Sequence, residues 1–276
     1  MGVHMIALPD GVRICAETFG DPRAPAIVLC QGASASMLWW DAAVCDLLAD
    51  AGRFVIRYDQ RDTGLSTKYP VGSPGYSHAD LARDVLEVLD ALGIERAHLA
   101  GCSMAGGVVL HLGLIAPERF ASLTFISTST GEPGLPAPEA SFPETPSGLS
   151  ELGAQVEFML AQVRACDDVS PFYDDAAARA LVQADAERSG DLRPALINHF
   201  LAELGHPDDA SFADLTLPTL VLHGELDPVF PLPHGEALAR AVPDSRFVVL
   251  PAQGHDLLPH NWERFVRELV AHTSAP

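Results

Sequence analysis

The sequence predicts an α/β fold, with a mostly parallel sheet that carries helices on both faces. Short apolar runs alternate with helical patterns along most of the 276 residues, an order typical of parallel strands joined by helical crossovers. The run Pro25–Cys30 is apolar without alternation, as expected for a strand buried on both faces. Hydrophobic residues make up 48% of the chain, enough for one large core.

Each element follows from local signals. A weakly alternating strand comes first and ends at the turn Gly20–Pro22. Apolar runs predict further strands, and 3.6-residue periodicity predicts the helices between them, as where Leu81, Val85 and Leu89 share one helical face and Gly93 ends the helix. Strands are expected at residues 12–18, 25–30, 53–59, 97–100, 123–127, 217–223 and 246–250, and helices at 40–51, 78–92, 107–114, 233–241 and 262–272.

Residues 129–214 differ from the rest in composition. They open with a proline-rich stretch at residues 133–138 and then show helical patterns near 149–166, 174–188 and 191–204, with no strand signal. We therefore expect residues 1–128 and 215–276 to form an α/β core and residues 129–214 to form a helical lid inserted between two strands.

The composition limits the function classes. Seventeen Lys and Arg residues against 37 Asp and Glu give a formal charge of -20, which disfavours nucleic acid and anionic membrane surfaces as partners. The five cysteines show no C-x-x-C spacing, which argues against a zinc site or a disulfide framework. With no membrane-length apolar run and no basic leader, a cytoplasmic protein is expected. No phosphate loop or dinucleotide fingerprint is present, so neither cofactor nor metal is expected, and the oligomeric state stays open.

The most informative stretch is Gly101–Gly106, which lies between a buried strand and a helix. Small residues at Gly101 and Ala105 flank Ser103 and fit a tight strand-to-helix turn. Such a turn lifts a serine hydroxyl out of the sheet, where it can serve as a nucleophile. The sequence therefore predicts Ser103 as a catalytic serine.

A serine nucleophile needs a base and an acid that orients the base. In α/β sheets the reacting groups gather beyond the carboxyl ends of the strands. Two loops that directly follow strands downstream of Ser103 carry Asp227, with Glu225 as a competing acid, and His255. The order Ser, Asp, His is that of the α/β-hydrolases.

These residues resemble the signature sites of the α/β-hydrolase superfamily: the turn Gly101–Gly106, the loop His223–Pro228 and the pair Gly254–His255. The segment Arg57–Thr67 and the stretch Pro233–Gly235 further resemble anthracycline methylesterases of the aclacinomycin methylesterase type. The resemblance implies a serine hydrolase that cleaves a carboxylic ester of a small, bulky or aromatic molecule through an acyl-enzyme.

An ester hydrolase must also stabilise an oxyanion with preorganised amides. We expect these amides to be the backbone N–H groups of Met104, directly after the nucleophile, and of Ala33, in the loop after Cys30. Relatives commonly carry a histidine where this chain has Gln31, which affects the bonding around this loop but not a backbone donor. Residues predicted to touch the substrate are Gly32, Trp39, Trp40, Phe142, Phe172, Tyr173 and Leu257.

The same triad also serves other activities. A cofactor-free haloperoxidase (perhydrolase) or a C–C bond hydrolase is the enzymatic alternative, and a hydrolase-fold small-molecule receptor is the non-enzymatic one. Haloalkane dehalogenase and epoxide hydrolase chemistry need an Asp nucleophile, so Ser103 argues against both.

Overall fold

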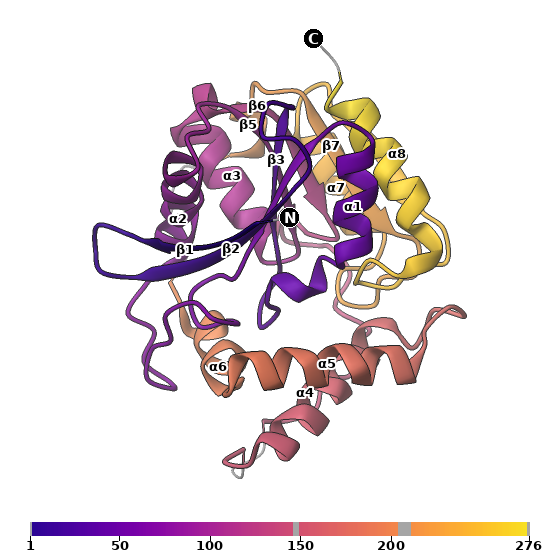
Figure 1. Ribbon diagram of the computed structural model, residues 1–276. Helices are drawn as coiled ribbons and strands as arrows, with labels where there is room; N and C mark the ends of the chain where they lie inside the picture. The colour runs from indigo at the N-terminus through magenta and orange to yellow at the C-terminus, as the bar shows by residue number, and fades with distance from the viewer. Residues whose placement is uncertain (1, 146–148, 204–210, 275–276) are drawn as a thin grey trace.

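An eight-stranded sheet forms the centre of the protein in a computed structural model that describes residues 2–145, 149–203 and 211–274 (Figure 1). The strand order is β1-β2-β4-β3-β5-β6-β7-β8. β2 is antiparallel to both of its neighbours, and the pairs from β4 to β8 are all parallel. The strands are β1 (Gly2–Ala7), β2 (Arg13–Phe19), β3 (Ala26–Cys30), β4 (Phe54–Tyr58), β5 (Ala97–Cys102), β6 (Phe120–Ile126), β7 (Thr219–Gly224) and β8 (Arg246–Leu250).

Helices cover both faces of this sheet, as the sequence predicted. One face packs against α2, α3 and α7, and the other packs against α1 and α8. Their bounds are α1 (Ala42–Asp50), α2 (His78–Ala91), α3 (Ala105–Ile115), α7 (Pro233–Ala241) and α8 (Trp262–His272). Helix α2 starts with a capping box between Ser77 and Asp80, which satisfies N–H groups that a helix start leaves free.

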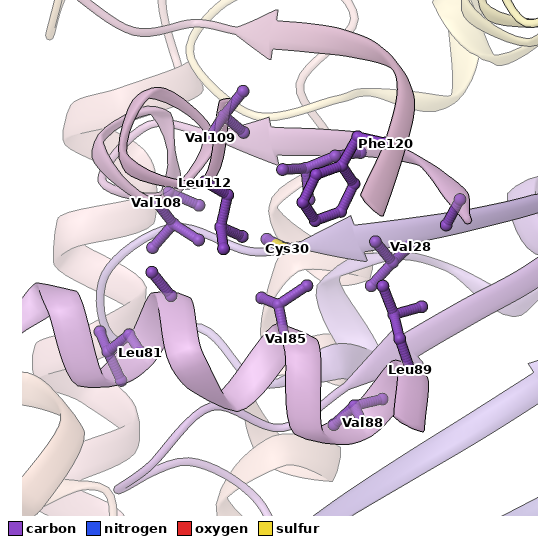
Figure 2. Packing of buried hydrophobic residues seen from close by; sticks show 14 of the residues in the cluster. Val28, Cys30, Leu81, Val85, Val88, Leu89, Val108, Val109, Leu112 and Phe120 are labelled. Atoms are coloured by element: carbon purple, nitrogen blue, oxygen red, sulfur yellow. The ribbon is translucent and has the colours of Figure 1, made fainter. Parts of the chain in front are cut away.

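Alternation along the buried strands builds two separate hydrophobic clusters. In β3, Val28 and Cys30 belong to the cluster under α2 and α3, whereas Ile27 and Leu29 belong to the cluster under α1 and α8. Successive side chains of a strand point to opposite faces, so a strand of this kind must be apolar throughout. Figure 2 shows the first cluster, where Val85 of α2 and Leu112 of α3 converge on β3.

Three helices lie between β6 and β7 and form a layer at one end of the sheet (Figure 1). They are α4 (Leu152–Asp167), α5 (Asp175–Ser189) and α6 (Arg193–Leu201). Their apolar side chains form a third hydrophobic cluster, which Trp39 of the α/β part joins. We call these three helices the α4–α6 layer.

The structure adds one strand that the sequence did not predict. β1 pairs with β2 at the edge of the sheet, and most of its side chains are exposed or half-buried. A strand with no fully buried face lacks the apolar pattern from which strands are recognised. Within the described residues, no helix is long and apolar enough to cross a membrane.

Candidate active site

The turn between β5 and α3 places Ser103 in a left-handed conformation, with φ of +51°. This conformation is unfavourable for a residue with a side chain, and contacts inside the sheet hold it. The Ser103 N–H donates to the Ile126 carbonyl at 2.9 Å, and the Thr128 hydroxyl donates to the Ser103 carbonyl at 2.8 Å. A Cβ on Gly101 would lie 2.6 Å from the Ala105 carbonyl oxygen, so only glycine fits there. We call residues 101–106 the Ser103 turn.

Asp227 and His255 form a buried pair. His255 Nδ1 lies 2.9 Å from Asp227 Oδ2 and 3.1 Å from Oδ1. The N–H groups of Val229 and Phe230 donate to Asp227 Oδ1 at 2.9 Å each, which orients the carboxylate toward the histidine. The arrangement keeps the proton on Nδ1 and leaves Nε2 as the basic atom.

The electrostatics of this pair favour a protonated histidine. Burial alone lowers the pKa of His255, but the negative charge and the hydrogen bond of Asp227 reverse that effect and raise the pKa above its ordinary value. Asp256 adds to the attraction. An imidazolium that forms during a reaction would therefore be stabilised here.

The carbonyl end of α4 supports the loop that carries His255, residues 251–256, which we call the His255 loop. The His255 N–H donates to the Cys166 carbonyl at 3.2 Å, and the Ser170 hydroxyl donates to the Ala252 carbonyl at 2.6 Å. Asp167 Oδ1 accepts the Asp256 N–H at 3.0 Å, and burial raises the pKa of both carboxyl groups, most strongly that of Asp167. Burial therefore disfavours the charged form of Asp167 more than that of Asp256.

The loop that follows β3, residues 31–36, lies directly beside Ser103, and we call it the β3 loop. A Cβ on Gly32 would lie 3.0 Å from the Ser103 Cβ, so glycine allows this close approach. Gln31 uses its side-chain oxygen to accept the Gly32 N–H at 2.9 Å. Among the described residues, no protein atom accepts the N–H of Ala33 or of Met104. Both groups are therefore available to a ligand.

These residues surround one cavity of about 430 Å³. Ser103, Met104, His255, Gly32 and Ala33 all line it. No hydrogen bond joins the side chains of Ser103 and His255 in the described part of the chain. Most of the other lining side chains are apolar: Trp39, Phe142, Met159, Val163, Phe200, Val229 and Phe230.

The remaining predicted contact residues lie elsewhere. Phe172, Tyr173 and Leu257 line a second cavity of about 540 Å³, which shares Trp39 with the first. Trp40 lines neither cavity. It is buried in the core and stacks on Phe265 with ring centroids 5.9 Å apart, because the short turn before α1 directs it under the sheet. The expectation that Trp40 faces the substrate is corrected by this position.

Several lining residues were not predicted. His78, Gln162 and His199 line the first cavity, and no local motif marks them in the sequence. His78 and His199 lie in segments predicted only as helices, and Gln162 lies in α4. The described residues contain no group of three or more His, Cys, Asp or Glu side chains that could hold a metal ion.

Known proteins resemble this chain over almost its full length. Rhodomycin D methylesterase DauP of Streptomyces sp. (strain C5) is 31% identical, and DnrP of Streptomyces peucetius is 30% identical; each alignment covers 96% of both chains. The esterase RhEst1 from Rhodococcus sp. ECU1013 superposes with a TM-score of 0.81 at 26% identity, covering 100% of this chain and 99% of its own. The predicted resemblance to anthracycline methylesterases is thereby confirmed.

The family match covers the strands from β3 to β8 and the residues that line the first cavity. It extends over residues 25–261 and carries the description alpha/beta hydrolase fold, which confirms the fold class and the expectation of a hydrolase. The chain belongs to the α/β-hydrolase fold family.

Proposed function

We propose that the protein is a serine hydrolase that cleaves a carboxylic ester through an acyl-enzyme, with Ser103 as nucleophile, His255 as base and Asp227 as orienting acid. The buried His255–Asp227 pair, on the same cavity as a serine in a left-handed turn, carries this proposal. Each group comes from a different strand end, which leaves them free for chemistry at a common point.

In the proposed reaction, Ser103 Oγ attacks the ester carbonyl while His255 Nε2 takes its proton. Catalytic hydrogen bonds of this kind often form only once substrate is bound. The N–H groups of Ala33 and Met104 receive the negative charge that develops on the carbonyl oxygen. His255 then returns the proton to the leaving alcohol, and water releases the acid in a second cycle with the same roles.

We propose a bulky or aromatic carboxylic ester as substrate, and a methyl ester as the first one to test. The apolar lining of the first cavity supports this class, and the second cavity beside it offers room for the distal part of a large molecule. The relatives named rhodomycin D methylesterase point to the same class. The α4–α6 layer covers this end of the sheet, and we propose that it is the lid predicted for residues 129–214.

The test compares wild-type protein with Ser103→Ala on p-nitrophenyl acetate and on methyl esters of aromatic acids. We expect a loss of at least ~10⁴-fold in kcat, and an aryl sulfonyl fluoride should add its mass to wild type only. Ester turnover that survives in Ser103→Ala would exclude the mechanism. Ligand binding by a wild-type protein that neither turns over esters nor is labelled would favour the receptor alternative.

A further inference from the structure

His199, in α6, makes two hydrogen bonds that join the α4–α6 layer to the catalytic end of the sheet. Its Nδ1 accepts the Ser34 N–H at 2.9 Å, and its Nε2 lies 2.8 Å from the Arg61 carbonyl oxygen. The side chain is buried and also lines the first cavity. Nothing in the proposed triad mechanism uses this histidine.

The two partners determine the protonation state of the ring. An N–H can only donate and a carbonyl can only accept, so Nδ1 must be bare and Nε2 must carry the hydrogen. Burial favours the same neutral form, because it lowers the pKa of His199 below its ordinary value. A protonated ring would face the Ser34 N–H with a second N–H and break the contact.

The Ser34 N–H lies next to the proposed oxyanion donor. Ser34 has φ of +67°, a strained conformation that persists only where its surroundings hold it. Its hydroxyl also donates to the Ala195 carbonyl of α6 at 3.2 Å. On the other side of Ala33, Gln60 Nε2 donates to the Gly32 carbonyl at 3.3 Å. That carbonyl and the Ala33 N–H belong to the same planar trans peptide. The two peptides that flank the Ala33 Cα are therefore both held by residues outside the loop.

We propose that His199 is a positioning residue that holds the Ala33 N–H of the oxyanion hole in place by accepting the Ser34 N–H. The inference rests on the proposed function and deepens it, since it makes the α4–α6 layer part of the catalytic geometry. His199 need not touch the substrate to act in this way. If the Ala33 N–H is displaced, the hydrogen bond that is weakened is the one that strengthens as negative charge develops on the carbonyl oxygen in the transition state.

A different residue anchors the helix itself. Asn198 Nδ2 donates to Asp62 Oδ2 at 2.9 Å, and its Oδ1 accepts the Gly72 N–H at 2.7 Å. Asp62 and Arg61 belong to the segment 57–67 that resembles the methylesterases. With Asn198 intact, α6 should keep its place when His199 is changed, which makes a test at His199 specific for the β3 loop.

Two substitutions separate the two hydrogen bonds. In His199→Asn the side-chain oxygen stands where Nδ1 stands and can accept the Ser34 N–H, but the bond to Arg61 is lost. In His199→Gln the side-chain nitrogen stands near Nε2 and can donate to Arg61, but the Ser34 N–H loses its acceptor. The proposal predicts that His199→Asn keeps kcat within about threefold, whereas His199→Gln loses about 10- to 100-fold in kcat with KM little changed.

Three further measurements accompany the kinetics. His98→Asn and His98→Gln are the matched controls, because His98 is a buried histidine whose Nδ1 pairs with Ser122 in the sheet; they should leave kcat unchanged. The inhibition constant of an aryl boronic acid, whose Ser103 adduct places an oxygen in the oxyanion hole, should rise with the loss of kcat. Nitrogen NMR of the wild-type ring should show hydrogen on Nε2 only.

The outcomes are distinct. Equal losses in both His199 variants at matched melting temperatures, a larger loss in His199→Asn, or a change confined to KM would each overturn the positioning role. A wild-type ring protonated on Nδ1 would do the same. Failure of the proposed function looks different, because wild type itself would then be inactive on esters and unlabelled at Ser103.

Discussion

The Ser103 turn and the β3 loop face the same cavity but are held in different ways. The Ser103 turn takes its shape from β6, from Thr128 and from glycines that allow α3 to pack closely. The β3 loop takes its shape partly from α5 and α6, through Asp185, Ala195 and His199, and partly from Gln60, which follows β4. The His255 loop is a third case, because its acid partner Asp227 lies in the loop after β7 while α4 supports its backbone.

The difference shows that the proposed nucleophile Ser103 and the proposed oxyanion donor Met104 are held by the α/β core. The Ala33 N–H and the backbone that carries His255 also depend on contacts with the α4–α6 layer. The third hydrophobic cluster is composed mainly of that layer's own side chains. We therefore expect that a shift of the layer would leave the main core closed. Changes in the core should affect stability, and changes at its contacts with the layer should affect activity.

A pair of glycine substitutions has the largest expected effect. The pair tests whether changes in the core affect stability while changes at the contacts with the layer affect activity. In Gly101→Ala the new Cβ would lie 2.6 Å from both the Ala105 carbonyl oxygen and Val109 Cγ2, inside the core. Because neither neighbour can move without disturbing the Ser103 turn, we expect the free energy of unfolding to fall by about 1–3 kcal/mol. Urea denaturation followed by circular dichroism measures this.

The matched variant is Gly254→Ala, where the new Cβ would meet Asp167 Oδ1 and, at 2.8 Å, the Cys166 carbonyl oxygen of α4. We expect α4 to move away from the His255 loop, so kcat should fall by about tenfold while stability changes by less than about 0.5 kcal/mol. A stability loss as large as that of Gly101→Ala would show that the layer and the core form one cooperative unit.

The pH dependence of ester hydrolysis tests the electrostatic environment of His255. The proposed base must be neutral to accept a proton, and its pKa is raised above the ordinary value of about 6.5. The kcat/KM for a p-nitrophenyl ester should therefore fall about tenfold per pH unit on the acid side of a midpoint above 6.5. A midpoint below 6.5 would contradict the stabilising influence of Asp227.

Asp167→Asn tests the contact between α4 and the His255 loop and should have the smallest effect. In wild type, burial raises the pKa of Asp167, so the folded chain keeps a proton that the unfolded chain loses above about pH 4. The stability that this proton contributes to the folded chain is fully present below about pH 4. It is lost as the pH rises through the pKa that Asp167 has in the folded chain.

An asparagine amide can donate to Asp256 permanently and has no proton to lose in this range. We expect Asp167→Asn to match wild type near pH 4 and to exceed its free energy of unfolding by about 1 kcal/mol at pH 8. Urea titrations at pH 4, 6 and 8 measure the two slopes. A variant that is less stable than wild type at pH 8 would contradict the raised pKa of Asp167.

Much of the fold and the positions of the candidate triad could be predicted because their signals are local. Most strands after β2 are apolar runs, and Ser103, Asp227 and His255 each follow a strand within a few residues. The lining of the cavity could not be predicted in the same way. Trp39 and Trp40 are adjacent and identical, yet Trp39 lines the cavity and donates its indole N–H to Asp185 at 3.0 Å, while Trp40 packs on Phe265.

The sequence by itself therefore determined the α/β architecture and the positions of the candidate nucleophile, acid and base, because periodicity and small-residue turns act over a few neighbouring residues. Only the tertiary structure decided which side chains surround the cavity and what holds the β3 loop. Ser34 and its acceptor His199 are separated by 165 residues. No short-range pattern can record such a contact, since it exists only once α6 has packed against the sheet.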